Sequence, residues 1–191
     1  MKKLLLTMLI LLISTSAYSA KYNRKNWKHW IDADKDGQNT RHEILIRDNV
    51  GKLKFKTKKK CKVVSGKWIC PYTGKTYYKA SDMDIDHIVP LKEAWRSGGA
   101  DWSKEKKRAF ANDPENLLAT EDNAYQAKGD KSLVKWLPIK PYWQMYAIKW
   151  MQIKQKYGLK YTKKERNILS DLMGIDVPTY NKQAEIKVRK Y

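Results

Sequence analysis

Asp86 and His87 are the two neighbouring residues best suited to hydrolytic chemistry. They lie in the stretch DIDHIVP, residues 84–90, and the chain has 3 histidines against 40 lysines and arginines. A histidine with an ordinary pKa near 6.5 can take a proton from water at neutral pH. A carboxylate beside it can hold a hard cation such as Mg²⁺. The pair therefore predicts a base next to a metal ligand.

The stretch around this pair is predicted to be a strand. Neighbouring strand residues face opposite sides of a sheet. Asp86 and His87 can therefore act at one point only if the strand is distorted, or if water and metal approach from its end. An isolated Asp-His step is usually a chance pair on the surface or a structural hydrogen bond, so the surrounding segments must show whether this pair is catalytic.

The charge of the chain indicates a polyanionic partner. The formal net charge is +20, and removing Lys2 and Lys3 leaves 38 basic against 20 acidic residues. Such an excess attracts nucleic acid, with anionic lipid or wall polymer as the alternative. Maintaining solubility is the simpler explanation, but the lysines are unevenly spread along the chain.

Residues 1–20 are predicted to be a signal peptide. Lys2 and Lys3 precede a ten-residue apolar run, and the small residues Ala17 and Ser19 fit a cleavage site, with a cut after Ala20 as the alternative. The run is shorter than the roughly 20 residues that a spanning helix needs. We expect a secreted or periplasmic protein with one domain over residues 21–176 and a tail at 177–191.

Two cysteines in an exported chain predict a disulfide between Cys61 and Cys70. The stretch CKVVSGKWIC is expected to form a hairpin with Ser65 and Gly66 at the turn. Counting outward from that turn places the cysteines on a non-hydrogen-bonded pair, within reach of a disulfide.

Alternating lysines precede this hairpin. If KLKFKTKKKCK is a strand, they share one face and form a cationic ladder that contacts DNA, or that blocks edge pairing. The ladder would contain Lys52, Lys54, Lys56, Lys58, Lys60 and Lys62.

Several helices are predicted downstream. Ser103 should cap a helix in KEKKRAFAN, and Thr162 with Glu165 forms a capping box for the last helix, which ends at Gly174. In the run PYWQMYAIKWMQIKQKYG, apolar residues recur at helical spacing and predict a core-facing stripe. That stripe contains Trp143, Tyr146, Ala147, Trp150, Ile153 and Tyr157.

The sequence resembles the HNH, or ββα-metal, endonuclease superfamily, and is most similar to an exported branch related to the C-terminal domain of the GmrSD restriction endonucleases. The segments that carry the resemblance are GKWICPYTGK, DIDHIVPLKEAW, FANDPENLLAT, QAKGDKS and WLP, with DADKDGQNTRHEILIRD upstream. Together with the downstream aromatic run they span about residues 27–158. The resemblance implies an α+β fold, in which a ββα-metal core is joined by the disulfide-clipped hairpin and surrounded by helices.

The resemblance also implies roles for individual residues. His87 would be the general base, Asp86 a ligand of one divalent cation (Mg²⁺ or Mn²⁺), and Asn116 the residue that orients the histidine. Lys128 and Lys131 would face the phosphates, assisted by Arg96.

One position departs from the family pattern. The residue expected to be a helix-borne Asn or His is Tyr125, which is a poor ligand for Mg²⁺. Asn123 and Gln126 are the neighbouring candidates, and Asn123 is preferred because its amide is short. Asp84 is a further flanking candidate.

A second metal candidate lies upstream, in residues 32–43. DADKDGQNTRHE fits the calcium-loop pattern D-x-D-x-D-G-x₅-E, with Asp32, Asp34, Asp36 and Glu43 as ligands. Against this, Asn39 replaces the usual apolar residue and Arg41 adds positive charge. The same residues could instead cap the next helix.

The function implied is that of an exported, metal-dependent endonuclease that cleaves DNA with little sequence preference, because positive charge contacts phosphates and phosphates carry no sequence. RNA is an alternative substrate. The alternative function is a basic binder of nucleic acid or surface polymer whose catalytic site has decayed at Tyr125.

Overall fold

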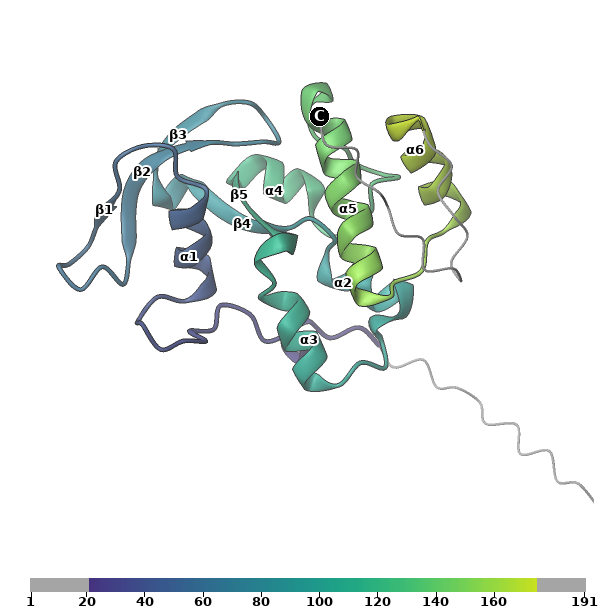
Figure 1. Ribbon diagram of the computed structural model, residues 1–191, viewed down its shortest axis with the longest axis horizontal. Coiled ribbons are helices and arrows are strands. Elements are labelled where there is room, and N and C mark those ends of the chain that lie inside the picture. Colours follow the sequence, from purple (N-terminus) through teal and green to yellow (C-terminus); the bar gives the residue numbers. More distant parts are fainter. Residues whose placement is uncertain (1–20, 175–191) are drawn as a thin grey trace, which may run out of the picture.

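The computed structural model describes residues 21–174, and the predicted signal peptide and C-terminal tail lie outside this range. The fold is α+β, with two small antiparallel sheets, one at an end of the molecule and the other among the helices (Figure 1). The helices are α1 Thr40–Arg47, α2 Leu91–Ala94, α3 Lys104–Ala111, α4 Asp122–Lys128, α5 Trp143–Tyr157 and α6 Lys163–Met173. The strands are β1 Lys54–Phe55, β2 Val63–Ile69, β3 Thr76–Lys79, β4 Met83–His87 and β5 Leu117–Glu121.

The predicted hairpin within residues 61–70 is wrong. Ser65 and Gly66 lie inside the continuous strand β2, which is the middle strand of the sheet β1-β2-β3. The glycine serves a close approach instead of a turn, because a Cβ atom there would lie 2.5 Å from Oδ1 of Asn49 and 2.7 Å from the ring of Trp68. The register of β2 against β3 also shifts between Ser65 and Trp68.

The predicted disulfide is also wrong, since Cys61 and Cys70 are both free thiols. They flank opposite ends of β2, and a strand of this length at about 3.3 Å per residue separates them by more than about 20 Å. A disulfide requires Cα atoms roughly 6 Å apart. Cys70 is buried and its sulfur accepts a hydrogen bond from the backbone N–H of Glu121, whereas Cys61 is half-buried.

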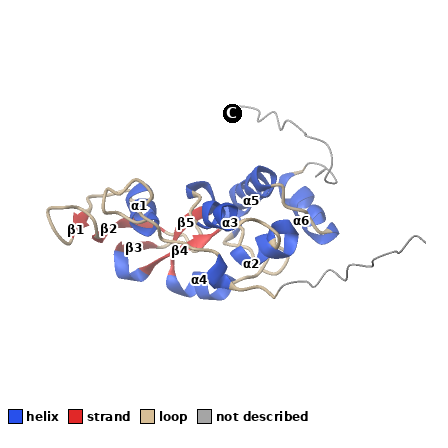
Figure 2. Ribbon diagram, turned by 90° about the horizontal axis from the view of Figure 1, so that it is seen from below, coloured by secondary structure: helices blue, strands red, loops and turns tan. Residues whose placement is uncertain are grey.

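The lysine ladder does not form either. Only Lys54 belongs to β1, and the chain then turns through Thr57 and Lys60, the latter with a φ of 56°. Lys56 and Lys58 therefore lie in the loop between β1 and β2. This loop forms one end of the molecule, away from α2 and α4, in both views (Figures 1 and 2).

The second sheet pairs β4 with β5 in antiparallel register, from Met83 opposite Glu121 to His87 opposite Leu117. Helix α4 begins directly after β5 and packs on both strands. Glu121 caps this helix through its carboxylate, which accepts from the N–H groups of Asn123 and Ala124. Two strands and a helix thus form one unit around the end of β4.

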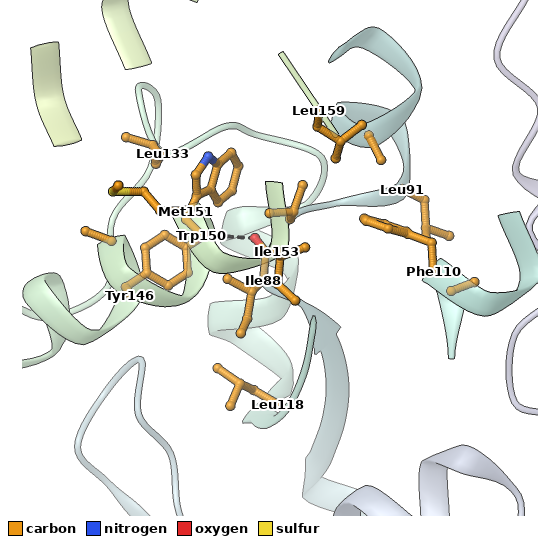
Figure 3. Packing of buried hydrophobic residues seen from close by; sticks show 14 of the residues in the cluster. Ile88, Leu91, Phe110, Leu118, Leu133, Tyr146, Trp150, Met151, Ile153 and Leu159 are labelled. Carbon is orange, nitrogen blue, oxygen red and sulfur yellow. Dashed lines mark hydrogen bonds between the residues drawn. The ribbon is translucent and has the colours of Figure 1, made fainter. Parts of the chain in front are cut away.

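The predicted aromatic helix is confirmed as α5, and it anchors the end of β4. Tyr146, Trp150 and Ile153 are buried and pack around Ile88, the residue after His87 (Figure 3). The hydroxyl of Tyr146 donates to the carbonyl of Ile88 at 3.2 Å. The apolar residues that follow the Asp-His pair therefore fix its backbone against the core.

The capping box of α6 is confirmed, with Thr162 and Glu165 exchanging both hydrogen bonds. Lys154 of α5 is fully buried and places its ammonium between carboxylates of α2 and α6, 3.0 Å from Glu93 and 2.6 Å from Glu165. This ion cluster ties the three helices together. No helix within residues 21–174 combines the length and apolar character needed to cross a membrane.

Candidate active site

Asp86 and His87 line the same pocket, which has a volume of about 330 Å³. His87 is the last residue of β4 and still pairs with Leu117, so both side chains reach the pocket at the end of the strand. The pocket lies between the end of β4, the start of α2, the end of α4 and the segment before α1. Its lining comprises Tyr22, Arg24, Asp86, His87, Pro90, Leu91, Lys92, Tyr125, Gln126, Gly129 and Asp130.

One oxygen of the Asp86 carboxylate, Oδ2, is held by two neighbouring side chains. Its Oδ2 atom accepts a hydrogen bond from the hydroxyl of Tyr72 at 2.7 Å and lies 2.8 Å from the ammonium of Lys128. Burial raises the pKa of Asp86, and the positive charge of Lys128 opposes that rise. The ion pair favours the charged form of the carboxylate, and together with the Tyr72 hydroxyl it fixes Oδ2.

Lys128 does not face the phosphates as expected. Its side chain is fully buried, and its ammonium donates to the carbonyl of His87 at 2.8 Å in addition to pairing with Asp86. Burial lowers the pKa of Lys128 and the charge of Asp86 opposes that effect. The lysine therefore connects the end of α4 to both residues of the Asp-His pair.

The imidazole of His87 has a defined tautomer. Its Nε2 atom lies 2.9 Å from the carbonyl oxygen of Ala111, and a carbonyl can only accept, so Nε2 carries the proton. The lone pair of the neutral ring is then on Nδ1, which has no hydrogen-bond partner among residues 21–174. Burial lowers the pKa of His87 to about 3, so the ring is uncharged at neutral pH and its Nδ1 carries no proton.

Asn116 supports the chain just after His87. It is fully buried, its Oδ1 accepts from the N–H of Val89 at 2.9 Å, and its Nδ2 donates to the carbonyl of Val89 at 3.2 Å. The carbonyl of Asn116 also accepts from the N–H of Ile88. This geometry suits the expected orienting role, which acts through the backbone.

The segment before α1 contributes contacts that the sequence patterns did not predict. The rings of His29 and Trp30 lie 6.5 Å and 6.1 Å from the ring of His87, centroid to centroid, with Trp30 stacked. Trp30 has a φ of 59°, which is rare for a bulky aromatic residue. Tyr22 and Arg24 line the pocket, and the charge of Arg24 contributes to lowering the pKa of His87.

Among the candidates for the helix-borne ligand, the structure brings Gln126 to the pocket together with Tyr125. Asn123, which the sequence favoured, is exposed and is not part of the pocket lining. Gln126 donates through Nε2 to Asp122, which leaves its amide oxygen as a potential ligand. Asp84 lies outside this pocket and is 3.7 Å from Arg41.

The oxygen donors of this pocket suit a hard cation that keeps most of its coordinated water molecules. Asp86 and Gln126 supply two oxygen donors in one pocket, and Mg²⁺ is commonly bound by one or two protein oxygens together with water and substrate phosphate. No cysteine lines this pocket, so the set does not match a zinc thiolate centre.

The remaining predicted phosphate-binding residues divide into two groups. Arg96 and Lys131 line a neighbouring pocket, with Arg96 paired to Glu93. Lys54, Lys56 and Lys58 lie in the sheet and loop at the far end of the molecule, so the structure does not bring them to the active-site pocket (Figure 2).

The acidic loop clusters three carboxylates. The ligand oxygens of Asp32, Asp34 and Asp36 lie within 4.8 Å of one another, and all three residues are exposed. Burial raises the pKa of Glu43, and the negative charges of the three aspartates raise it further, so Glu43 lies beside them. Within residues 21–174, α1 is the one α-helix beside the loop, because a single 3-10 turn, Arg24–Asn26, precedes it. Calcium binding here stays a prediction.

Comparison with known proteins identifies the family. Residues 39–172 match the family described as "GmrSD restriction endonucleases, C-terminal domain", and the chain belongs to it. Membership points to a nuclease, and hence to a nucleic-acid substrate. The matched range includes Asp86, His87, Asn116 and Lys128, whereas Tyr22, Arg24 and Trp30 precede it.

One curated relative is an "Uncharacterized secreted protein" of Arthroderma benhamiae. It is 39% identical over 155 residues, covering 80% of this chain and 74% of the relative. No protein of known structure matches the chain.

Proposed function

We propose that this protein is an exported, metal-dependent endonuclease of the HNH type that hydrolyses DNA with little sequence preference. The observation that carries the proposal is the shared pocket of Asp86 and His87, in which one residue offers a carboxylate and the other a neutral imidazole with a free Nδ1. The unit of β4, β5 and α4 would be the ββα-metal core.

The proposed reaction is direct hydrolysis of a phosphodiester. Nδ1 of His87 takes a proton from water, whose oxygen forms a bond to phosphorus while the bond to the leaving sugar oxygen breaks. A divalent cation held by Asp86 and Gln126 would neutralise charge on the phosphate and on the leaving oxygen. Tyr72 and Lys128 keep the Asp86 carboxylate in place for this role.

DNA is proposed as the substrate because the chain carries a large positive excess without a separate recognition module. RNA is the alternative, and comparing cleavage of matched DNA and RNA strands decides between them. Export is supported by the signal-peptide pattern of residues 1–20 and by the secreted relative.

A plasmid-nicking assay tests the proposal. Wild-type protein should nick with Mg²⁺ or Mn²⁺ and lose activity in EDTA, and His87→Ala should lose at least about 100-fold, as expected for a general base. His42→Ala is the matched control, because this histidine lies in α1, outside the pocket. Nicking that persists in His87→Ala would refute the assigned base.

A second function is favoured by two specific features. Tyr125 occupies the position of the expected ligand, and the ammonium of Lys128 already pairs with Asp86. Both are compatible with a basic nucleic-acid- or surface-polymer-binding protein that has lost catalysis. Tight DNA binding without cleavage under any divalent ion would support this function instead.

A further inference from the structure

A second pocket lies beside the active-site pocket. It has a volume of about 380 Å³ and shares the wall residue Asp130 with the first. Asp130 follows α4 and the turn at Gly129, and it pairs with Lys92 on the side of the active site and with Arg96 on the side of the second pocket. The two pockets are therefore neighbours on either side of Asp130.

Basic side chains dominate the second pocket. Arg96, Lys131, Lys135 and Lys160 line it from three different parts of the chain. The two acidic side chains in its wall are already neutralised, because Glu93 pairs with Lys154 and Arg96, and Asp130 pairs with Lys92 and Arg96. The pocket therefore presents a net positive charge to a ligand.

Lys135 and Lys160 are the cations in this pocket that are free to bind a ligand. Arg96 is held by Glu93, and the ammonium of Lys131 donates to the carbonyl of Ala127 at 2.6 Å. Within residues 21–174, neither Lys135 nor Lys160 has a partner for its ammonium group. Their backbones are fixed, since the N–H of Lys135 donates to Ser132 and that of Lys160 to Ser97.

The two pockets are close enough to bind one strand. Lys128 contacts both residues of the Asp-His pair, and Lys131 of the second pocket is three residues further along the chain. Three residues span at most about 10 Å. The second pocket therefore lies within a few nucleotides of the active site.

We infer that this second pocket binds the phosphodiester backbone of the substrate strand beside the cleaved bond, with Lys135 and Lys160 as the phosphate ligands. The inference rests on the proposed nuclease function for its choice of a polynucleotide. Phosphate contacts of this kind fix the position of the strand and add affinity without reading the sequence.

Binding tests the subsite without cleavage. The affinity of the full-length protein for a single-stranded oligonucleotide is measured in EDTA at several salt concentrations. The double variant Lys135→Ala/Lys160→Ala should lower the slope of log K against log salt by about 1.4, because each phosphate contact on a single strand contributes roughly 0.7. The matched control is Lys75→Ala/Lys104→Ala, which removes the same charge from exposed positions outside the pocket. An equal change in both variants, or no change in the first, would overturn the inference.

Cleavage provides the second measurement. With the oligonucleotide, KM of the subsite variant should rise by roughly tenfold, because two phosphate contacts that add affinity are lost. Hydrolysis of bis(4-nitrophenyl) phosphate, which is too small to reach the second pocket, should be unchanged. If the small diester is affected equally, the lysines act at the active site and the subsite is refuted. If wild-type protein cleaves neither substrate, the nuclease proposal fails, while the salt dependence of binding still decides the subsite.

Discussion

The ammonium group of Lys128 lies 2.8 Å from Oδ2 of Asp86, and the two side chains are 0% and 4% exposed. This buried ion pair connects the last residue of α4 to the penultimate residue of β4, 42 positions apart in the sequence. It places a fixed positive charge beside the proposed metal ligand, and it holds the carbonyl of His87 as well.

Replacing Lys128 should destabilise the fold strongly. In Lys128→Met the charge of Asp86 is left buried without its counter-ion and keeps only neutral hydrogen-bond donors such as Tyr72, so we expect the free energy of unfolding to fall by about 3–5 kcal/mol. Urea unfolding measures this loss. The control Lys131→Met removes an exposed lysine from the same region and should cost less than about 1 kcal/mol.

Removing both charges separates stability from activity. The double variant Lys128→Met/Asp86→Asn no longer buries an unpaired charge, so it should regain much of the stability lost in Lys128→Met. The double variant should have no nicking activity, because the carboxylate proposed to hold the cation is gone. Recovery of activity would contradict the assignment of Asp86.

Tyr72 should tune the proposed cation site. In Tyr72→Phe the ring stays in the aromatic cluster, but the hydrogen bond to Asp86 is lost. We expect the Mg²⁺ concentration for half-maximal nicking to rise by about tenfold, since residues that orient a metal ligand usually affect affinity by 10–100-fold.

Tyr157→Phe is the matched control for Tyr72→Phe. It removes the same kind of hydrogen bond, from a tyrosine hydroxyl to the carboxylate of Asp113 at 2.8 Å, outside the active-site pocket. A Mg²⁺ titration of both variants makes the comparison. If they shift the Mg²⁺ requirement equally, or not at all, Tyr72 has only a structural role.

The two cysteines should titrate as free thiols. Without reductant, a thiol reagent should modify one thiol per chain in the native state, the half-buried Cys61, and both thiols in denaturant, because Cys70 is buried. Adding reductant should leave Tm unchanged. A denatured chain with no reactive thiol would show a disulfide and contradict the structure.

The local patterns that predicted elements correctly are those whose cause is local. The period of the aromatic stripe predicted α5, and the spacing of Thr162 and Glu165 predicted the start of α6. The same reasoning failed at Ser65-Gly66, where the turn chemistry is satisfactory but the glycine is needed for its contact with Trp68. That contact depends on the tertiary structure and leaves no local signal.

The sequence predicted those residues of the site that lie in recognisable motifs, but not the contacts between them. The chemistry of neighbouring residues indicated Asp86 and His87, the family resemblance added Asn116, and the structure brings the three together around the end of β4. The burial of Lys128 could not be predicted from the sequence, because a lysine at the end of a helix is usually exposed to solvent. Tyr72 lies within GKWICPYTGK, one of the segments that carry the resemblance. Its hydrogen bond to Asp86 depends on how the chain after β2 packs against β4, and the sequence gives no local signal of that contact.

The stability of the first sheet should depend on pH through His42. Its Nδ1 accepts a hydrogen bond from the N–H of Val63 at 3.3 Å, and partial burial, followed by the charges of Arg41 and Lys62, lowers the pKa of His42. As the pH falls, His42 is therefore protonated at a higher pH in the unfolded chain than in the folded chain. The contribution of neutral His42 is complete above about pH 6.5 and is lost as the pH falls below 6.5 toward the lowered folded pKa.

His42→Gln isolates this effect, because glutamine keeps an acceptor but does not titrate. Urea unfolding at pH 7, 6 and 5 should show a smaller loss of stability for the variant than for wild type. We expect the difference to be less than about 1 kcal/mol, since the side chain is partly exposed and solvent screens its charge. Parallel pH profiles would exclude His42 as the titrating group.

Asn116 offers the sharpest test of how the backbone positions His87. In Asn116→Ala the N–H and carbonyl of Val89 both lose their buried partner, so the free energy of unfolding should fall by about 2–5 kcal/mol. Asn116→Asp keeps the acceptor for the Val89 N–H but loses the donor to the carbonyl. If Asn116 positions His87, both variants should lower kcat at a temperature where they remain folded, and leave KM nearly unchanged, because Asn116 lies outside the pocket lining and acts through the residues that follow the histidine. A change confined to KM would place Asn116 in substrate binding instead.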